Sequence, residues 1–502
     1  MVSSTFVPSL IMLSSAALAV ASAIKPLRFA NVKRQEAGWP DVIASSVIND
    51  TSSEFGLKSA RWSSYEAPTF DAVFIPETEE DLSVGLEYFT RQNIPFLTKS
   101  GGHGYSTTLR QVQDGVLINM EKFNYSRVND DFTATIGSGA TFNDMVYAIG
   151  TAGREATVGS CPCVGVMGAT LGGGVGRLQG LHGLASDAVR KVRLALWNGT
   201  IVEACDDVNP DLFWGLRGAG QNFGVVIETT FETYPATNDG FSYEAQMTFN
   251  ASSLGSVVDA VNSLLPLDPA LALVTIVAAD PETLETVVLV NLVYAGPEDQ
   301  GKEFAQPFVD LSVTTVESII SWVDLPTKGA GGFNNVQCIK GRRNSLYGLT
   351  NKVIDKPSVL EMADDFSSLV QANPALSASA FLIETFAVQG IDALPDDYSA
   401  FPHRGHLDHF FEIIVSYEDD SVAEVGDDWA MRWRDHFRNP NISGYDTVAV
   451  YQNYGHGDEA PSILYGSDEW RHERLTALKN SYDPQGVFNA YHPIPTAIED
   501  WS

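Results

Sequence analysis

Glycine is distributed unevenly along the 502-residue chain, and this pattern constrains the organisation of the fold more than any other feature. From about residue 40 to 235, glycine turns separate short apolar segments from amphipathic ones. From about 240 to 445, glycine is sparse and long aliphatic segments follow one another. The first pattern predicts an α+β domain, and the second predicts a sheet with helices on one face. The tail, residues 446–502, is again rich in turns.

The expected strands and helices follow from apolar periodicity. In the first part, VFIP (73–76) and PFLTKS (95–100) are predicted strands on either side of a helix, and the stretch around Asn198-Gly199 predicts a hairpin. In the second part, the predicted strands are ALVTIVAAD, ETVVLVNLVYAG, SAFLIETFAV and HFFEIIVSYED, and the predicted helices are SVVDAVNSLL and DDWAMRWRDHFR. The chain is therefore expected to form at least two domains, each with a full core.

The chain is strongly acidic, with 31 Lys+Arg against 63 Asp+Glu and a formal net charge of −32. Such a surface repels phosphate backbones and anionic lipid head groups, so neither nucleic acid nor a membrane is an expected partner. Beyond the N-terminus, no segment approaches 18 uninterrupted apolar residues, and the mature chain is expected to be soluble and monomeric.

The N-terminus has the pattern of a secretory signal. Residues 8–23 are apolar and end in the small-residue pattern Ala21-Ser22-Ala23, which predicts a signal peptide over residues 1–23 rather than a buried helix. A dibasic Lys33-Arg34 marks either the end of a propeptide, residues 24–34, or a chance pair. Five N-x-S/T sequons support export and N-glycosylation of a secreted protein: Asn49, Asn124, Asn198, Asn250 and Asn441.

Four cysteines in so long a chain do not form a disulfide scaffold, so the core must supply the stability. Cys161 and Cys163 lack a second Cys/His pair at zinc spacing, so no structural zinc is predicted. The disulfide state of Cys205 and Cys338 stays open.

Three histidines, His403, His406 and His409, could suggest a metal site. Their i, i+3, i+6 spacing suits neither one face of a strand nor a zinc signature, and they lie in a loop that enters a strand. A structural role is favoured, and no metal is expected.

The glycine run 172-GGGVGRLQG-180 does not match the dinucleotide fingerprint, because Arg177 or Gln179 stands where the third glycine of G-x-G-x-x-G is required. The stretch 215-GLRGAGQNFG-224 fails in the same way at Phe223. The sequence also contains neither a P-loop nor a G-x-S-x-G nucleophile elbow.

The stretch 99-KSGGHGYS-106 does fit a phosphate-binding loop. Adjacent glycines let the backbone approach an anion closely, and successive N–H groups there form a nest for a pyrophosphate. A histidine directly after such a loop lies against whatever carries the phosphates. Taken alone, the stretch favours an ordinary glycine turn with an incidental histidine.

The loop is one of six motifs that occur together. These are His103 in S-G-G-H-x-Y, Cys161 in C-P-x-V-G-V-x-G, 211-DLFWGLRGAGQNFGVV-226, 401-FPHR-404, 451-YQNY-454 and YDPQGVF near the end. In this order and spacing, from about residue 60 to 495, the chain resembles the berberine-bridge-enzyme-like flavoproteins of the vanillyl-alcohol-oxidase superfamily, with a PCMH-type FAD-binding domain.

The resemblance implies a two-part α+β FAD domain, residues 35–238 and 446–502, with a substrate domain, residues 239–445, inserted between the parts. The substrate domain is expected to be an antiparallel sheet covered by helices on one face. FAD is expected to be bonded covalently through His103 to the flavin 8α carbon and through Cys161 to flavin C6. Cys161 is chosen over Cys163 because it stands three residues before Val164-Gly165, and Cys163 is then a packing residue; a buried inert thiol is the alternative for Cys161.

Further residues are assigned to the cofactor by the same resemblance. Val164 falls where family members tune oxygen access to the flavin, and the glycines after it pack backbone against the cofactor. The set comprises Ser100, Gly101, Gly102, Gly104, Val164, Gly165, Gly168, Gly172, Gly173, Gly174, Gly218, Gly220, Asn222, Val225 and Asn453.

The catalytic base is expected among four residues. Tyr454, the second tyrosine of Y-x-N-Y, matches a base of carbohydrate-oxidising members, and Glu384 on the strand SAFLIETFAVQG matches an assisting carboxylate. Tyr105 matches another active-site tyrosine, and Tyr451 either takes part or packs beneath the flavin. A phenol is a poor base at neutral pH, so either a glutamate that accepts the proton or a positive field on the flavin side is required. The chain departs from the family by having Thr385-Phe386-Ala387-Val388 where x-x-Gly-Gly is usual, which leaves the register of Glu384 open.

The resemblance thus implies a secreted FAD oxidase that passes a hydride to flavin and electrons to O₂, giving H₂O₂. The segment GRLQGLHGLASD favours oxidation or oxidative cyclisation of a small aromatic or polyketide-like metabolite. Oligosaccharide C1 oxidation is the first alternative, and a flavin dehydrogenase or a flavin-binding protein with little activity is the second.

Overall fold

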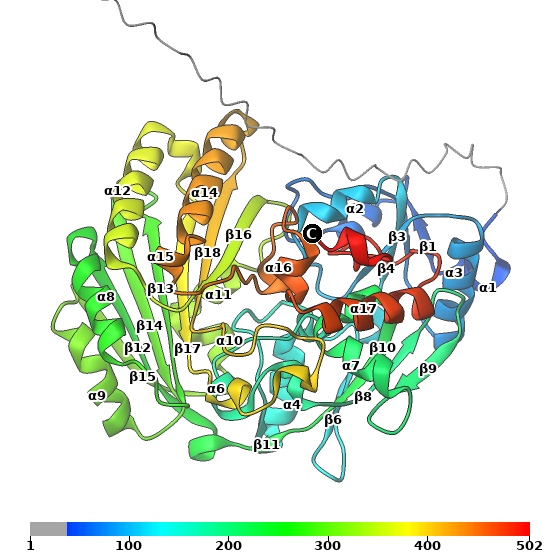
Figure 1. Ribbon diagram of the computed structural model, residues 1–502, viewed down its shortest axis with the longest axis horizontal. Helices are drawn as coiled ribbons and strands as arrows, with labels where there is room; N and C mark the ends of the chain where they lie inside the picture. Colours follow the sequence, from blue (N-terminus) through cyan, green and yellow to red (C-terminus); the bar gives the residue numbers. More distant parts are fainter. Residues whose placement is uncertain (1–37) are drawn as a thin grey trace, which may run out of the picture. The chain divides into compact units, whose positions relative to one another are not determined.

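The computed structural model describes residues 38–502 (Figure 1). The predicted signal peptide and propeptide lie outside the described residues. Among residues 38–502, no helix combines the length and the apolar composition that crossing a bilayer requires.

The strands form four sheets, and the predicted α+β class is confirmed. The four-stranded sheet has the order β1 (Val47–Asn49), β2 (Phe70–Phe74), β4 (Gly115–Asn119), β3 (Phe96–Lys99), and the five-stranded sheet has the order β5 (Ser126–Val128), β6 (Ala134–Gly137), β10 (Val225–Phe231), β8 (Val189–Ala195), β9 (Ile201–Ala204). A two-stranded sheet pairs β11 (Tyr234–Pro235) with β7 (Arg154–Glu155). The seven-stranded sheet has the order β15 (Thr314–Ser321), β12 (Phe241–Asn250), β14 (Thr286–Tyr294), β13 (Leu271–Ala279), β17 (Ala380–Phe386), β18 (His409–Tyr417), β16 (Arg343–Asn351).

The four-stranded sheet contains a parallel β-α-β unit, as the sequence predicts. Helix α3 (Glu79–Arg91) connects β2 to β3, and β4 lies between these two strands and parallel to both. The helix begins at a capping box in which Thr78 and Asp81 bond each other's backbone amides. Its buried face, which includes Leu82, Leu86 and Phe89, packs on the sheet.

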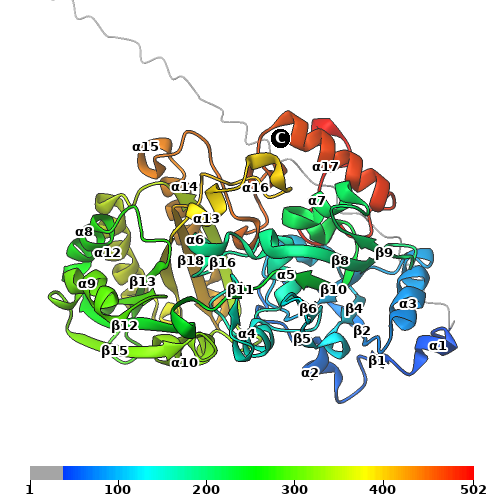
Figure 2. The same ribbon diagram turned by 90° about the horizontal axis from the view of Figure 1, so that it is seen from below.

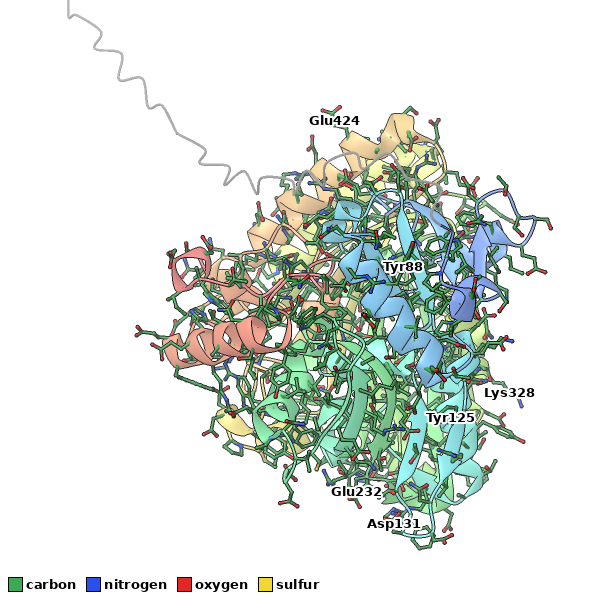
Figure 3. All side chains as sticks on the ribbon, turned by 90° about the vertical axis from the view of Figure 1, so that its right-hand side faces the viewer. Tyr88, Tyr125, Asp131, Glu232, Lys328 and Glu424 are labelled. Carbon is green, nitrogen blue, oxygen red and sulfur yellow. A yellow bond between two sulfur atoms is a disulfide. The ribbon has the colours of Figure 1, made fainter. Side chains whose placement is uncertain are left out.

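The five-stranded sheet is antiparallel and carries two hairpins. The predicted turn at Asn198-Gly199 joins β8 to β9, with Gly199 at φ +80°. Figure 3 views this side of the molecule: α3, which carries Tyr88, crosses the front, and the hairpin from β5, next to Tyr125, reaches its tip near Asp131.

The seven-stranded sheet is antiparallel throughout, and α8 (Leu254–Ser263), α9 (Glu298–Val309), α12 (Lys356–Ala372) and α14 (Ala423–Phe437) cover one face of it (Figure 1). Strands β13, β14, β17 and β18 and helices α8 and α14 confirm the segments predicted above. The central strand β13 is buried on both faces, which explains its nearly continuous apolar sequence. Strands β12, β15 and β16 were not predicted.

The tail returns to the glycine-rich part of the chain. Helix α17 (Glu469–Tyr482) lies beside α7 (Pro210–Ala219) in both ribbon views (Figures 1 and 2). Asn222 ties the tail down, since its Nδ2 donates to the Tyr465 hydroxyl and the His492 carbonyl and its Oδ1 accepts from the Ile494 amide. Residues more than two hundred positions apart therefore complete one body.

The remaining helices are short or lie in connections. They are α1 (Asp41–Ala44), α2 (Phe55–Ser59), α4 (Phe142–Thr151), α5 (Val166–Leu171), α6 (Gln179–His182), α10 (Leu325–Lys328), α11 (Phe333–Val336), α13 (Gln389–Asp392), α15 (Pro440–Ser443) and α16 (Pro461–Tyr465).

Candidate active site

A cavity of about 440 Å³ lies between the glycine-rich part of the chain and the uncovered face of the seven-stranded sheet. Most of the predicted site residues line it, and they come from loops far apart in sequence. Those in its wall are Ser100, Gly101, Gly102, His103, Gly104, Tyr105, Cys161, Val164, Gly165, Gly168, Gly174, Val225, Glu384, Tyr451, Asn453 and Tyr454.

The loop after β3 has the geometry of an anion nest. Gly102 adopts φ +82°, which turns the chain sharply, and the Ser100 hydroxyl is buried without a hydrogen-bond partner among the described residues. A side chain on Gly101 would collide with the backbone of Gly165, so the two glycine segments approach each other as closely as backbones can. Free polar groups and bare backbone suit a phosphate ligand.

Gly168 shows where a large group fits. A Cβ atom on Gly168 would meet nothing within 4 Å, although the residue lies in the cavity wall. The wall is therefore recessed at this helix, α5. A recess beside a phosphate nest is the shape that FAD requires, and the residues present fit this cofactor.

His103 is prepared to act as a neutral nucleophile. Its ring stacks on Trp62 at a centroid distance of 5.6 Å, and burial lowers the pKa of His103 to about 4. Its Nε2 lies 3.2 Å from Cys163 Sγ. Because that sulfur is in a disulfide and carries no proton, Nε2 is the donor and Nδ1 keeps its lone pair. The neutral ring can attack an electron-poor carbon through Nδ1.

Cys161 is a free, half-buried thiol in the same wall. Its Sγ lies 3.6 Å from Cys163 Sγ and, with His103, within a group whose nitrogen and sulfur atoms are all within 4.8 Å of one another. Burial raises the pKa of the Cys161 thiol to about 11, so it is protonated at neutral pH in this structure. His103 and Cys161 are close enough to hold two positions of one flavin ring.

The predicted packing role of Cys163 is wrong, because Cys163 forms a disulfide with Cys338, 175 residues away. The bond joins the loop that carries Cys161 to the segment after α11. It could not be read from the sequence, since cysteine spacing does not determine pairing.

Five predicted cofactor residues do not line the cavity. A Cβ atom on any of the glycines among them would collide with protein rather than enter the cavity: Gly172 with Asn453, Gly173 and Gly218 with Phe401, and Gly220 with Leu171. The side chain of Asn222 is hydrogen-bonded to the tail, at Tyr465, His492 and Ile494. These residues let protein segments pack closely behind the cavity wall.

Tyr454 and Glu384 form the polar centre of the cavity. The Tyr454 hydroxyl donates a 2.9 Å hydrogen bond to Glu384 Oε2. Glu384 lies on β17 opposite Val274 of β13, on the sheet face that lines the cavity, so the departure from x-x-Gly-Gly does not turn it away. Gly348 in β16 lets Tyr454 come this close, because a Cβ there would collide with the Tyr454 backbone.

Glu412 is a third member of this centre that sequence reasoning missed. It lies on β18 opposite Leu382, diagonal to Glu384 on the same face, so the two carboxyl groups are within electrostatic reach of each other. Burial, and then the charge of Glu384, raise the pKa of Glu412 well above its usual value. The signal was present in the sequence as a single glutamate within the apolar strand HFFEIIVSY.

The environment treats the two carboxyl groups differently. Burial raises the pKa of Glu384, while the hydrogen bond from Tyr454 and the charge of Arg177 oppose the shift. For Glu412 the charge of Glu384 adds to the effect of burial and raises the pKa further. The site therefore favours the proton on Glu412 over the proton on Glu384, which accepts the hydrogen bond from Tyr454.

Tyr105 and Tyr451 line the cavity, but their hydroxyl groups bond to the protein. The Tyr105 hydroxyl donates to the Asn453 carbonyl at 2.7 Å. The Tyr451 oxygen accepts from the Gly174 amide at 3.0 Å and from Asn453 Nδ2 at 2.6 Å. Both tyrosines thus hold the segment 451–454 in place, which positions Tyr454.

The histidines of 403–409 form bonds of an ordinary structural kind. His403 Nε2 contacts the Leu464 carbonyl at 3.1 Å, and His409 Nδ1 contacts the Thr385 hydroxyl at 2.9 Å.

Comparison with known proteins agrees with this geometry. Residues 70–204 match the family model of an FAD binding domain, and residues 450–495 match the model described as berberine and berberine like. The FAD-linked oxidoreductase srdI of Neurospora crassa is 32% identical over 480 residues, which is 93% of this chain and 94% of that protein.

Two solved structures have the same fold. Physcomitrella patens BBE-like 1 superimposes with a TM-score of 0.78 at 23% identity, covering 91% of this chain and 98% of that one. The glucooligosaccharide oxidase of Acremonium strictum superimposes with a TM-score of 0.77 at 20% identity, again over 91% and 98%. That oxidase carries a 6-S-cysteinyl, 8α-N1-histidyl FAD.

Proposed function

The chain belongs to the berberine-like family of FAD-linked oxidoreductases, and we propose that it oxidises a hydroxyl-bearing carbon of a small, largely apolar metabolite, or cyclises such a metabolite oxidatively, with O₂ as the final acceptor. The observation that carries the proposal is the Tyr454–Glu384 hydrogen bond in the wall of the cavity. It provides a base where a hydroxyl proton has to leave.

The tyrosine works as a relay rather than as a free phenolate. Burial, followed by the charge of Glu384, raises the pKa of Tyr454 well above its usual value, so the phenolate is strongly disfavoured. Tyr454 accepts the substrate proton only while its own proton passes along the existing hydrogen bond to Glu384. The carboxylate of Glu384 then holds that proton. Before the transfer, Glu412 stabilises the Glu384 anion.

When bound, FAD supplies the acceptor for the hydride. His103 is the residue proposed to hold it at the 8α carbon, because its Nδ1 is unprotonated and the ring is neutral at physiological pH. Cys161 is proposed as the second attachment at C6. Its raised pKa means that Cys161 carries a proton at neutral pH and must lose it when the bond to C6 forms.

The lining of the substrate sheet supports an apolar substrate body. The residues that the sheet presents to the cavity are mostly aliphatic: Val274, Ile276, Leu346, Leu382 and Ile414. An aromatic or polyketide-like ring system matches such a wall, whereas a sugar needs many hydrogen-bonding partners. Oligosaccharide oxidation remains the second candidate, because one solved structure with this fold is a glucooligosaccharide oxidase.

Use of O₂ is supported by the small side chain of Val164, which lines the cavity three residues after Cys161. A flavin dehydrogenase is the alternative. Export is supported by the sequons, since Asn49, Asn124, Asn198, Asn250 and Asn441 are all exposed and can carry glycans without repacking. Secretion by a fungal host and sensitivity to an endoglycosidase test this part.

A peroxide-coupled screen of the purified yellow protein against phenolic alcohols and oligosaccharides tests the proposal. We expect H₂O₂ with members of the first group and little with the second. Photoreduction without oxygen, followed by air, then separates the classes of acceptor. Rapid reoxidation with release of peroxide supports an oxidase, and reoxidation over many minutes identifies a dehydrogenase or an inert flavin carrier.

A further inference from the structure

Arg177 is a buried guanidinium with no bonding partner. Its side chain is 8% exposed, and within residues 38–502 it forms no hydrogen bond, ion pair or ring stacking, Nη1 being fully enclosed. The other buried arginines are all bonded: Arg217 to the Phe213 and Tyr398 carbonyls, Arg404 to Asp187, Arg434 to Asp458 and Arg471 to Asp396. Arg177 is therefore an exception within this protein, because burying an unpaired cation opposes folding strongly.

The side chain belongs to the cavity wall. Arg177 follows the glycine run 172–176 and lines the same cavity as Tyr454 and Glu384. Burial lowers the pKa of Arg177, and the charges of Glu244 and Glu384 oppose that shift, so both carboxylates lie within electrostatic reach but outside bonding distance. The group remains charged, since a guanidinium does not lose its proton in proteins.

Glu244 does not pair with Arg177, because its carboxylate is hydrogen-bonded elsewhere. Its carboxylate accepts from Asn291 Nδ2 at 2.8 Å, from the Ala330 amide at 2.6 Å and from the Ser318 hydroxyl at 3.2 Å. These bonds fix Asn291 on β14 and leave its Oδ1, which is buried, without a partner among the described residues. Asn291 also lines the cavity, in one cross-strand row with Val274 and Glu384.

We propose that Arg177 and Asn291 anchor a substrate that carries an oxyanion beside a hydroxyl group, as an aromatic hydroxy acid does. The guanidinium donates to the oxyanion, and Asn291 Oδ1 accepts from the hydroxyl. This inference rests on the proposed function and deepens it, because the anchored ligand lies in the cavity that contains Tyr454.

The chemistry of the two groups selects this ligand class. A guanidinium offers paired N–H donors that match the two oxygens of a carboxylate, and the pairing is strongest where water is excluded. A carbonyl oxygen such as Asn291 Oδ1 accepts but does not donate, so it requires a donor on the ligand. A neutral ligand fills the aliphatic wall but leaves the cation of Arg177 unpaired.

Titration calorimetry of the oxidised holoprotein with salicylate and with salicylamide tests the inference. The two probes have the same aromatic body and hydroxyl group and differ in the charge of one substituent. We expect salicylate to bind about 10- to 100-fold more tightly than salicylamide, the range that a charge-assisted hydrogen bond supports. Arg177→Gln should remove this preference, and Arg177→Lys should keep part of it. Asn291→Ala should weaken both probes alike.

Arg190→Gln is the matched control, since Arg190 pairs with Glu232 on the surface. Yellow colour and an unchanged melting temperature establish that a variant is folded. If Arg177→Gln is not folded, the test is whether Arg177→Lys prefers salicylate over salicylamide less strongly than the wild type does. Equal affinity of the two probes for wild type, or binding of neither, overturns the inference. So does a shifted flavin spectrum of Arg177→Gln without ligand, which would assign the guanidinium to the cofactor. The assay needs no turnover, so it stands apart from failure of the oxidase proposal.

Discussion

The hydroxyl of Tyr454 and the carboxylate of Glu384 lie 2.9 Å apart, although 70 residues separate them in the sequence. The phenol alone is a poor base at neutral pH, because burial and the charge of Glu384 raise its pKa. In the proposed mechanism the pair passes a proton from the substrate through Tyr454 to the carboxylate of Glu384.

Tyr454→Phe should slow flavin reduction by the best substrate of the screen about 10²- to 10⁴-fold, because the relay loses its first oxygen. The flavin should remain bound and yellow. Anaerobic stopped-flow bleaching measures the rate. Tyr65→Phe is the control, since Tyr65 also donates a 2.9 Å bond to a carboxylate, Asp427, but does not line the cavity. Reduction of Tyr454→Phe at nearly the wild-type rate would show that another group takes the proton.

Glu412→Gln should stabilise the protein above the usual pH range of glutamate ionisation. The pKa of Glu412 is raised in the folded state, so its contribution to stability is complete below the unfolded pKa and is lost as pH rises through the folded pKa. Glutamine keeps the hydrogen-bonding shape without the charge. Melting temperatures of the two proteins should diverge as the pH rises above about 4, where glutamate ionises in the unfolded chain. Parallel curves would mean that Glu412 is not buried with its proton.

Flavin should stay attached to the protein after acid precipitation of the Cys161→Ala variant and should be released from the double variant His103→Ala/Cys161→Ala. The reason is that each side chain forms an independent bond to the same ring. Peptide mapping by mass spectrometry should find flavin on the peptides that contain His103 and Cys161. A flavin found on His103 alone would assign Cys161 as an inert thiol.

Cys163→Ser should lower the free energy of unfolding by about 2–5 kcal/mol. The reason is that the disulfide with Cys338, 175 residues away, closes a loop and so restricts the conformations of the unfolded chain. Cys205→Ser is the control, since Cys205 is a free cysteine. Denaturant unfolding with and without reductant measures the difference. Equal unfolding midpoints for the two variants would contradict a structural role of the disulfide.

The sequence was informative where local pattern and tertiary environment agree. Strand β13 is nearly continuously apolar because both of its faces are buried, and the hairpin at Gly199 needs a residue that tolerates a positive φ. Strand β16 was missed because it buries Asn344, Ser345 and Thr350, which look exposed in a sequence. Their partners, among them Ser63, Ser416 and the Ala449 carbonyl, lie in distant segments.

The site residues also fall into two groups, those that motifs identify and those that only the structure reveals. The family resemblance pointed to His103 and Tyr454 through the motifs S-G-G-H-x-Y and Y-x-N-Y. Glu412 and Arg177 stand singly in ordinary segments, and only the sheet register and the cavity reveal what faces them. The pairing of Cys163 with Cys338 depends on how two parts of the chain meet, which no local pattern contains.

The tail that Asn222 holds has a consequence for the order of events in the cell. Asn453, Tyr454 and Tyr491 are all in the cavity wall, and they are synthesised after the phosphate nest and His103. The phosphate-binding loop and His103, several hundred residues earlier, therefore lack one wall of the cavity until the tail has been synthesised. We therefore expect a premature stop just before Asn453 to leave a colourless protein.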